Sequence, residues 1–431
     1  MIKYIIIFLI LFKSNFLFAE NSVISFVESA LKNNPKINAE RENLKAIKQN
    51  EKISRSEFLP SLTISGTQES TETSNIVNQS GTRPGISKRN TETKKISIDQ
   101  KIFQGFQGYN NFKKSRLEFE KAENEYKQVE QDTILNSVSA YYDLIFKNKS
   151  KDFNLANVDL FERQVESDRS RLQKGEISLT DLAQSESSLA GAQAAFIKAD
   201  TEYVSAIAEF ERINRIKAPK NLNDNFNVSF IMPYNLDNAL ELSNSNNPSL
   251  AIARINLAIS EKELNVEKAK LSPSATLNYS ITENKDLSAT VNEDEQETVK
   301  ATVSWPIIKG GKNFSSIKKF KHKKEKNALL LADKENEVRT QTATTWSFFQ
   351  SAESVLTSTE AQLKAAEIAN EGITLEYDSG NTRTTLDVIQ SRSLLLEARI
   401  SNARAKKDLI VSKLRLLSQV GGLELNSFKI P

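Results

Sequence analysis

Two kinds of apolar spacing alternate along the chain and predict long helices separated by strands. The helical spacing, with steps of three, four or seven residues, is clearest at Leu182, Leu189, Ala192, Phe196, Ala199, Tyr203, Ala206 and Phe210. It recurs at Leu395, Ala398, Asn402, Ala405, Leu409, Ser412 and Leu416, and with one step of five at Ala122, Tyr126, Val129, Ile134, Val138, Tyr141 and Ile145. Residues 113–172 contain no proline or glycine, and 176–218 contain only Gly191 before Pro219. These segments are predicted to be long, closely packed helices.

The second spacing has period two and predicts four strands with one apolar face. It is formed by Leu62 and Ile64, by Ile96, Ile98 and Ile102, by Ala275, Leu277, Tyr279 and Ile281, and by Ala301, Val303 and Trp305. The strands are predicted at about 61–67, 95–103, 274–282 and 299–306. The polar stretches between the members of each pair, 68–94 and 283–299, are predicted to be exposed loops.

Both patterns occur twice because the chain is a tandem duplication. Asn34-Pro35 recurs 213 positions later as Asn247-Pro248, and Leu59-Pro60-Ser61 recurs as Ser272-Pro273-Ser274. Ile102-Phe103-Gln104-Gly105 matches Ile307-Ile308-Lys309-Gly310, and Gly175 matches Gly380, both 205 positions later. Each half therefore reads helix, strand, long loop, strand, helix, helix. We expect a first repeat over 20–218, a connecting segment over 219–235, a second repeat over 236–418 and a tail over 419–431.

The N-terminus has the pattern of a secretory signal. Lys3 precedes an apolar stretch from Tyr4 to Phe12, and Ala19 offers a small residue for cleavage, so 1–19 are predicted to be a signal peptide. The alternative is a membrane anchor, which the short apolar stretch and its interruption at Lys13 disfavour, because a spanning helix needs about 20 apolar residues.

Composition excludes several function classes. The chain of 431 residues has no cysteine and one histidine, His322, so thiol chemistry, thiolate metal sites and Ser/His/Asp catalysis lack their residues. The 58 basic side chains nearly balance 55 acidic ones, which gives no general case for nucleic-acid binding. We therefore expect no enzyme, no cofactor and no nucleic-acid partner.

Four strands with one apolar face cannot close a barrel alone, and an open sheet would leave edges that invite pairing. A secreted chain with such strands and no long apolar helix is typical of a transmembrane β-barrel. Several copies would be needed to close it. Two copies would give eight strands and three would give twelve, and the periodicity does not choose between them.

Two segments with a central glycine and matching positions in the duplication carry a family resemblance. They are Leu172-Gln173-Lys174-Gly175-Glu176-Ile177-Ser178-Leu179-Thr180-Asp181-Leu182 and Tyr377-Asp378-Ser379-Gly380-Asn381-Thr382-Arg383-Thr384-Thr385-Leu386-Asp387-Val388. With the Asn-Pro openings and the duplication, the chain resembles the TolC-like outer-membrane efflux channels over essentially its whole mature length.

The resemblance implies a mixed α/β membrane protein in which four strands per protomer contribute to a trimeric 12-stranded β-barrel, continued by long antiparallel helices that form a periplasmic tunnel. It also implies an outer-membrane exit duct for a tripartite efflux or type I secretion system, with a homotrimer that meets a periplasmic adaptor, an inner-membrane transporter and outer-membrane lipid. Two alternatives stay open: a stand-alone pore, and a soluble periplasmic coiled-coil protein with a structural role.

The two glycine-centred segments are predicted to be the turns of helix hairpins. Gly175 and Gly380 suit the positive φ that ends a helix. Thr180, Asp181 and Thr384 offer acceptors to the next helix start. Capping alone would explain these residues. The resemblance additionally implies that Gly175, Thr180, Gly380 and Thr384 contact the adaptor.

The resemblance also implies a gate at these turns. Asp181, Tyr377 and Arg383 match positions that hold neighbouring helix pairs together, and Asp387 matches a ring of aspartates at the constriction. Gln390 replaces a second acidic ring, which reduces the expected preference for cations. The alternatives are a solvated ion pair without a gating role and a first-turn aspartate facing water.

Two clusters of basic residues and two aromatic residues could either contact the membrane or have an ordinary structural role. A lysine run, formed by Lys318, Lys319, Lys321, Lys323, Lys324 and Lys326, follows the fourth predicted strand, and Lys113, Lys114 and Arg116 follow the second. A collar touching lipid phosphates and a solvated helix face are both consistent with them. Trp305 and Tyr279 suit either an interfacial aromatic belt or core packing.

Overall fold

The computed structural model describes residues 23–73, 87–222, 231–288, 291–379 and 383–428. The predicted signal peptide, Gly380, and parts of the predicted segments 219–235 and 419–431 lie outside these ranges. The chain divides into two compact units, which are taken separately below. Unit 1 comprises Met1–Arg41, Glu125–Leu250 and Glu335–Pro431, and unit 2 comprises Glu42–Asn124 and Ala251–Lys334.

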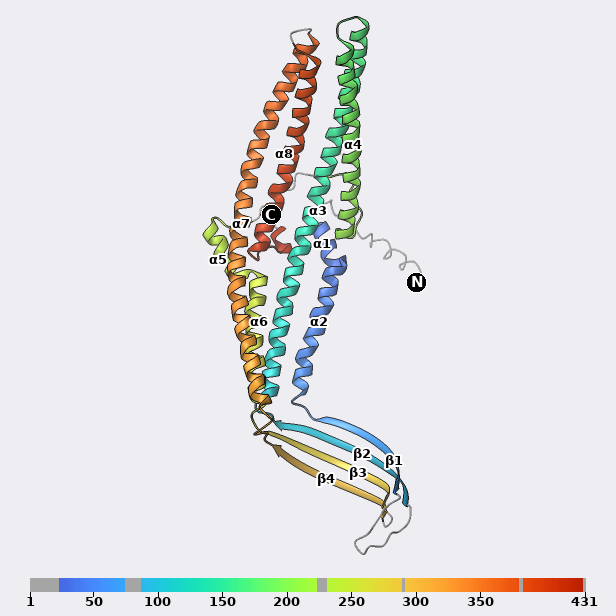
Figure 1. Cartoon of the computed structure of the whole chain (residues 1–431), viewed down its shortest axis with the longest axis vertical. Helices are drawn as coiled ribbons and strands as arrows, with labels where there is room; N and C mark the ends of the chain where they lie inside the picture. Colours follow the sequence, from blue (N-terminus) through green and yellow to red (C-terminus); the bar gives the residue numbers. More distant parts are fainter. Residues whose placement is uncertain (1–22, 74–86, 223–230, 289–290, 380–382, 429–431) are drawn as a thin grey trace, which may run out of the picture. The chain divides into compact units, whose positions relative to one another are not determined.

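The element order repeats, as the duplication predicts (Figure 1). The first half contains α1 (Val23–Asn33), α2 (Pro35–Ser56), β1 (Ser61–Thr73), β2 (Ser87–Phe103), α3 (Gln107–Gln173) and α4 (Leu179–Asn214). The second contains α5 (Leu236–Asn246), α6 (Pro248–Ala269), β3 (Ser274–Ser288), β4 (Val291–Ser304), α7 (Lys312–Asp378) and α8 (Thr385–Gln419), followed by the 3-10 helix η1 (Leu425–Phe428). Each half opens with two helices where the sequence predicted one. Among the described helices, none has a stretch long and apolar enough to cross a membrane.

Unit 2 holds one curved antiparallel sheet in the order β1-β2-β3-β4. The prediction of exposed loops at 68–94 and 283–299 is wrong for the described parts, because β1 to β4 extend through them. Pairing continues from Gln68 with Glu92 to Thr73 with Ser87, and from Glu283 with Glu295 to Ser288 with Val291. The ladder joins backbone groups, so it does not need apolar side chains.

Polar side chains also bond across this extended part of the sheet. Ser70 Oγ donates to Asn90 Oδ1 at 2.7 Å, and Thr93 Oγ1 donates to Asn284 Oδ1 at 2.9 Å. Trp305, which was expected in the fourth strand, follows its last residue, and its Nε1 donates to the Leu271 carbonyl at 3.0 Å.

Close packing explains a glycine in the turn between β2 and α3. Gly105 has φ +58°, and a Cβ there would lie 2.3 Å from Ser272 Cβ and 2.6 Å from the Ala269 carbonyl oxygen. The turn thus approaches the end of α6 more closely than any side chain allows.

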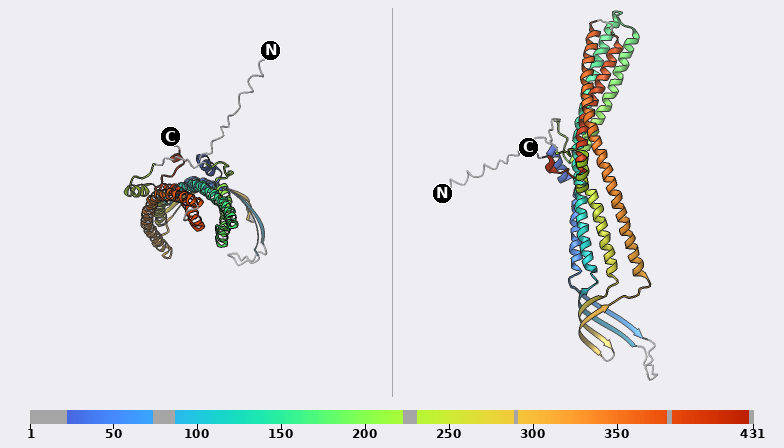
Figure 2. Two further views of the ribbon diagram at one scale, coloured as in Figure 1. Left: turned by 90° about the horizontal axis from the view of Figure 1, so that it is seen from above. Right: turned by 90° about the vertical axis from the view of Figure 1, so that its left-hand side faces the viewer.

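The helices of unit 1 confirm the predicted seams. Helices α4, α3, α8 and α7 form a curved row, with α1 and α5 on its convex side (Figure 2). Ala192, Ala199, Ala206 and Phe210 of α4 are buried, as are Leu395, Ala398, Asn402, Ala405 and Leu416 of α8. An aromatic cluster anchors α1 to this row, since the Phe26 ring lies 5.0 Å from that of Tyr141 and 5.3 Å from that of Phe210.

The duplicated Asn-Pro pair has a physical role in unit 1. Asn34 Nδ2 donates to the carbonyl of Ile213 at 3.0 Å, near the end of α4, and Asn247 Nδ2 donates to the carbonyl of Gln419 at 2.8 Å, at the end of α8. These bonds satisfy carbonyls that a helix end leaves unpaired. Pro35 and Pro248 then begin α2 and α6, where a missing N–H costs nothing. Each copy of the motif therefore joins the start of one helix to the end of another.

Candidate gate at the hairpin tips

The α4 and α8 helices begin with the same capping box. Ser178 Oγ accepts the Asp181 amide at 3.2 Å, and Asp181 Oδ2 accepts the Ser178 amide at 2.9 Å. Thr384 Oγ1 and Asp387 repeat this exchange at 3.2 and 2.9 Å. Thr384 is thus the cap that the sequence suggested, whereas the cap of α4 is Ser178 and not Thr180.

The capping bonds also set the charge of the two aspartates. Hydrogen bonds from the hydroxyl and amide of Ser178 hold the pKa of Asp181 below its ordinary value. The amide and hydroxyl of Thr384 do the same for the pKa of Asp387. Hydrogen bonds to the ionised form favour it, so both carboxylates are charged at neutral pH.

Gly175 ends α3 as predicted. It has φ +74°, its amide donates to the Leu172 carbonyl at 3.0 Å, and the Glu176 amide donates to the Arg171 carbonyl at 2.9 Å. This pair of bonds is a Schellman ending, which requires the left-handed conformation that glycine adopts without strain. Gly380, its counterpart, lies outside the described residues.

A buried polar cluster joins the two hairpins just inside the turns. Asp168 of α3 is fully buried, and Tyr377 of α7 is 5% exposed. The Tyr377 hydroxyl donates to Asp168 Oδ1 at 3.0 Å, and Gln164 Nε2 donates to the same oxygen at 3.0 Å. Ser185 of α4 donates to Asp168 Oδ2, and Thr385 of α8 lies 3.1 Å from the Tyr377 hydroxyl. Asp168 and Tyr377 thus connect all four long helices of unit 1.

Two arginines lie near this cluster. The Arg171 guanidinium lies 4.6 Å from the centre of the Tyr377 ring, and burial lowers the pKa of Arg392, whose Nη1 donates to the Leu160 carbonyl at 3.2 Å. Burial and the charge of Asp168 raise the pKa of Tyr377, so its hydroxyl stays neutral and acts as a donor. A buried charge held by several donors makes this contact costly to break from one side.

Sequence reasoning identified Tyr377 but missed Asp168. A signal was present, because Val158, Phe161, Val165 and Asp168 have the steps of three and four residues that mark the buried face of α3. A carboxylate on an otherwise apolar seam requires buried partners.

Among the described residues, Arg383 and Asp181 each bond within their own hairpin and not to each other. Arg383 Nε lies 2.6 Å from Glu376 Oε2 in its own hairpin, and Asp181 is held by its capping box. The α3–α4 hairpin has a similar pair, with Arg171 Nε 3.3 Å from Glu176 Oε2. Asp387 and Gln390 lie together on a groove of about 400 Å³ between α7 and α8, which Ala366, Ile373 and Leu394 also line.

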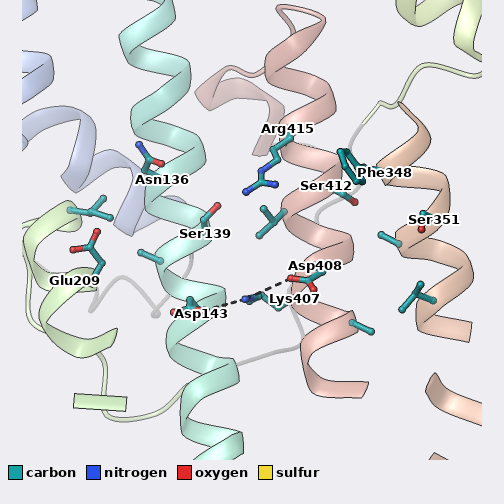
Figure 3. Close-up of a pocket in the computed structure, with 16 residues that line it drawn as sticks. Asn136, Ser139, Asp143, Glu209, Phe348, Ser351, Lys407, Asp408, Ser412 and Arg415 are labelled. Atoms are coloured by element: carbon teal, nitrogen blue, oxygen red, sulfur yellow. Dashed lines mark hydrogen bonds and ion pairs between the residues drawn. The ribbon is translucent and has the colours of Figure 1, made fainter. Parts of the chain in front are cut away.

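A second polar site lies among the same helices in a cleft of about 650 Å³ (Figure 3). Lys407 Nζ of α8 lies 3.2 Å from Asp143 Oδ1 of α3 and 3.7 Å from Asp408 Oδ1. Arg415 and Glu209 add charges to the lining. Within the described ranges, no three His, Cys, Asp or Glu side chains gather into a group that could hold a metal ion.

Known proteins that resemble this chain in sequence belong to one family. The family model described as "Outer membrane efflux protein" matches residues 26–213 and 239–422, one segment in each repeat. The chain is 24% identical to the outer membrane efflux protein BepC of Brucella suis, over 93% of this chain and 87% of that protein. It is 21% identical to the alkaline protease secretion protein AprF of Pseudomonas aeruginosa, over 92% and 83% of the two chains.

Solved structures share the fold. The Campylobacter jejuni outer membrane channel CmeC aligns with a TM-score of 0.82 at 15% identity, covering 93% of this chain and 85% of that one. The Vibrio cholerae outer membrane protein VceC aligns with a TM-score of 0.76 at 16% identity, covering 93% and 96%.

Proposed function

Because the chain belongs to the outer membrane efflux protein family, we propose that three copies form an exit duct that receives substrates from an inner-membrane transporter through a periplasmic adaptor. Membership of this family confirms the resemblance, the channel class and the outer-membrane location that the sequence predicted. The predicted fold class is confirmed too, since one four-stranded sheet and long antiparallel helices in two repeated halves form the fold shared with these channels.

The sheet supports assembly from several copies. β1 and β4 are its edge strands, and an edge exposes backbone donors and acceptors that another copy can pair. Leu62, Ile64, Val299 and Val303 are exposed on one face, as a lipid-facing surface requires. Three copies would supply twelve strands and leave no open edge.

We propose that the hairpin tips form the gate of this duct. The observation that carries the proposal is the buried bond between Tyr377 and Asp168, because it fixes one hairpin against the other. Asp181 and Arg383 would then bind across neighbouring copies, while Asp387 and Gln390 line the constriction. Opening requires the two hairpins to separate, so the contacts that join them stabilise the closed state. Each of these contacts can be removed by a single substitution.

We further propose that the outer ends of the hairpins contact the adaptor. Leu179, beside the α3–α4 turn, is 71% exposed, and Leu386 at the start of α8 is 42% exposed. Each hairpin thus presents one exposed leucine near its turn, beside Thr180 in one hairpin and Thr384 in the other, and these leucines are available to a partner. Gly380 belongs to the same proposal by its place in the sequence.

The assembly is tested by extracting the protein in mild detergent, measuring its mass and recording single channels in planar bilayers. A trimer with channel activity supports the proposal, whereas a monomer without channel activity contradicts it. Copurification with an adaptor, compared between wild type and Leu179→Asp, tests the tips. Val204→Asp is the control, because Val204 is 57% exposed but lies near the other end of α4.

A further inference from the structure

The segment that joins β4 to α7 is apolar at first and then basic. Trp305, Ile307 and Ile308 follow the last residue of β4 and are 62%, 71% and 87% exposed. From Trp305 to Lys324 the chain has seven lysines and no acidic residue. Exposed apolar side chains followed by lysines are typical of a chain that leaves the apolar layer of a membrane through the lipid headgroups.

The corresponding segment of the first repeat is less basic. Residues 100–119, which lie 205 positions earlier, have four basic side chains and one acidic one. One of the four is already paired, because Lys114 Nζ lies 3.6 Å from Glu118 Oε1. Exposed apolar residues occur in both repeats, since Phe106 is 69% exposed. The excess of lysine is therefore a property of the second repeat that the duplication does not explain.

One side of α7 packs against α6 and contacts acidic residues of that helix. Ser316 Oγ donates to Glu267 Oε2 at 2.7 Å, and Lys324 Nζ lies 3.7 Å from Glu261 Oε1. Glu267 is also paired with Lys270 Nζ at 2.6 Å. The two carboxylates therefore act on the side of α7 that carries Ser316 and Lys324.

Another side of α7 carries a stripe of one aromatic and two basic side chains, Phe314, Lys318 and Lys321. Steps of four and three residues place them on one face of the helix. Phe314 is 64% exposed, and both lysines are exposed. Within the described parts of the chain, neither lysine forms an ion pair, even with Glu325 one turn farther along, and neither lies over an aromatic ring. The stripe therefore presents two unpaired ammonium groups beside an exposed ring.

Lys319 and Lys323 lie toward the opposite flank of α7 and have partners there. Their Nζ atoms lie 5.9 and 4.5 Å from the centre of the Phe320 ring, within the range of a cation–π contact. Lys319 also interacts electrostatically with Glu267 of α6. The two lysine pairs thus carry the same charge on the same turns of the helix and differ in side and in partners, which makes this second pair a matched control.

We infer that Phe314, Lys318 and Lys321 bind anionic phospholipid at the membrane surface, with the Phe314 ring among the acyl chains and both ammonium groups on headgroup phosphates. The inference rests on the proposed barrel, which would hold β4 in the membrane. The rise from Phe314 to Lys318 is about 6 Å, close to the depth of a headgroup layer. Helical side chains tilt toward the N-terminus, so those of Lys318 and Lys321 extend toward the end of α7 that adjoins the sheet (Figure 1). Lipid phosphates there would balance the charge of two lysines that lack a described protein partner.

The stripe is tested by lipid quenching of a single tryptophan in reconstituted vesicles. All proteins carry Trp305→Phe, Trp346→Phe and Phe314→Trp, so that the fluorescence comes from the stripe. Brominated lipids quench tryptophan on contact, so vesicles that mix brominated phosphatidylglycerol with phosphatidylcholine, or the reverse, measure the preference for the anionic lipid at this position. Lys318→Gln/Lys321→Gln is compared with Lys319→Gln/Lys323→Gln, which removes the same charge from the opposite flank.

We expect the preference for phosphatidylglycerol to fall by roughly fivefold or more in Lys318→Gln/Lys321→Gln, at least the effect of one lysine near an anionic surface, and to stay unchanged in the control. It should shrink between about 0.1 and 1 M salt, because the screening length falls from about 10 to 3 Å. Equal preferences in the two double variants would overturn the stripe. Competition by soluble glycerol 3-phosphate would overturn it too, because the lysines would then bind free phosphate and not a lipid surface. A tryptophan that neither brominated lipid quenches would instead contradict the proposed barrel.

Discussion

The two hairpin turns of this chain share their capping and differ in how they connect to the rest of the molecule. Ser178 with Asp181 and Thr384 with Asp387 make the same pair of bonds at 3.2 and 2.9 Å. Beside the turn of the second hairpin lies the buried Tyr377, whose counterpart 205 positions earlier in the first hairpin is the apolar Leu172. The duplication kept the bonds that build each turn, and the copies diverged in the bond that joins one hairpin to the other.

The arginine ion pair near each turn also differs in whether it contacts the other hairpin. Arg171 pairs with Glu176 in its own hairpin and also lies over the Tyr377 ring of the other one. Arg383 pairs with Glu376 and has no contact with the α3–α4 hairpin among those described for the chain. If the hairpins separate when the duct opens, Arg171 loses a contact within the protomer, whereas the proposed gate would use Arg383 toward a neighbouring copy.

Asp168→Ala should have the largest effect, because it removes the acceptor shared by both hairpins. The substitution leaves the buried donors of Tyr377, Gln164 and Ser185 without their acceptor. Each unsatisfied donor costs about 1–3 kcal/mol, and each 1.36 kcal/mol changes an equilibrium tenfold. We expect the closed tip to be lost, with a several-fold rise in single-channel conductance. Asp159→Ala is the control, because Asp159 lies on the same helix and is exposed. Similar conductance in the two variants would mean that the buried cluster does not hold the gate.

Tyr377→Phe should have a smaller effect of the same sign, because it removes one hydroxyl and keeps the ring. A hydrogen bond to a charged group contributes about 1.5–3 kcal/mol, so the closed fraction should fall without being abolished. Conductance and protease cleavage at the tips measure this change. Tyr234→Phe serves as the control, since Tyr234 is 80% exposed. If the Tyr377→Phe channel has wild-type conductance, the Tyr377 hydroxyl does not help to keep the duct closed.

Asp168 and the strands show what the sequence could predict and what it could not. The helix seams follow from apolar spacing and the duplication from the recurring Asn-Pro, Pro-Ser and glycine positions, and both are present in the structure. The ends of β1 and β3 were missed because polar residues in a ladder carry no apolar alternation. The partner of Tyr377 was missed because it lies 209 positions away in the sequence, and only packing of α3 against α7 brings the two side chains together.

Substituting the cap residues tests whether the two hairpin turns, which share the same capping box, are equally stable. Ser178→Ala and Thr384→Ala should each destabilise the first turn of the following helix by about 1 kcal/mol, because an alanine cap leaves amides unpaired. Amide exchange over the first turns of α4 and α8 should accelerate by similar factors. Thr201→Ala is the control, since its hydroxyl bonds only within α4. A much larger effect of one cap than of the other would show that the turns are not equivalent.

Acid should loosen both turns together. The pKa values of Asp181 and Asp387 are lowered in the folded chain, so the stabilisation they give is present above their unfolded pKa of about 3.9 and is lost as the pH falls through the lower folded values. Amide exchange at Ser178 and Thr384, corrected for its intrinsic pH dependence, should stay constant from neutral pH to about pH 4 and rise below it. Ser178→Ala should move the Asp181 transition upward and leave that of Asp387 in place. If amide exchange begins to accelerate well above pH 4, the pKa values of Asp181 and Asp387 are not lowered in the folded chain.

The smallest effect, and the one that separates the hairpins most sharply, should come from the exposed pair of Arg383 and Glu376. Both side chains are 42–49% exposed, so breaking this bond within one hairpin should change its stability little. The proposed gate nevertheless requires Arg383 to bind a carboxylate of a neighbouring copy. Arg383→Gln should therefore raise single-channel conductance slightly, whereas Glu376→Gln, which breaks the same bond from the other side, should not. Identical conductance in the two variants would confine Arg383 to its own hairpin and leave Asp168 and Tyr377 as the contact that closes the tip.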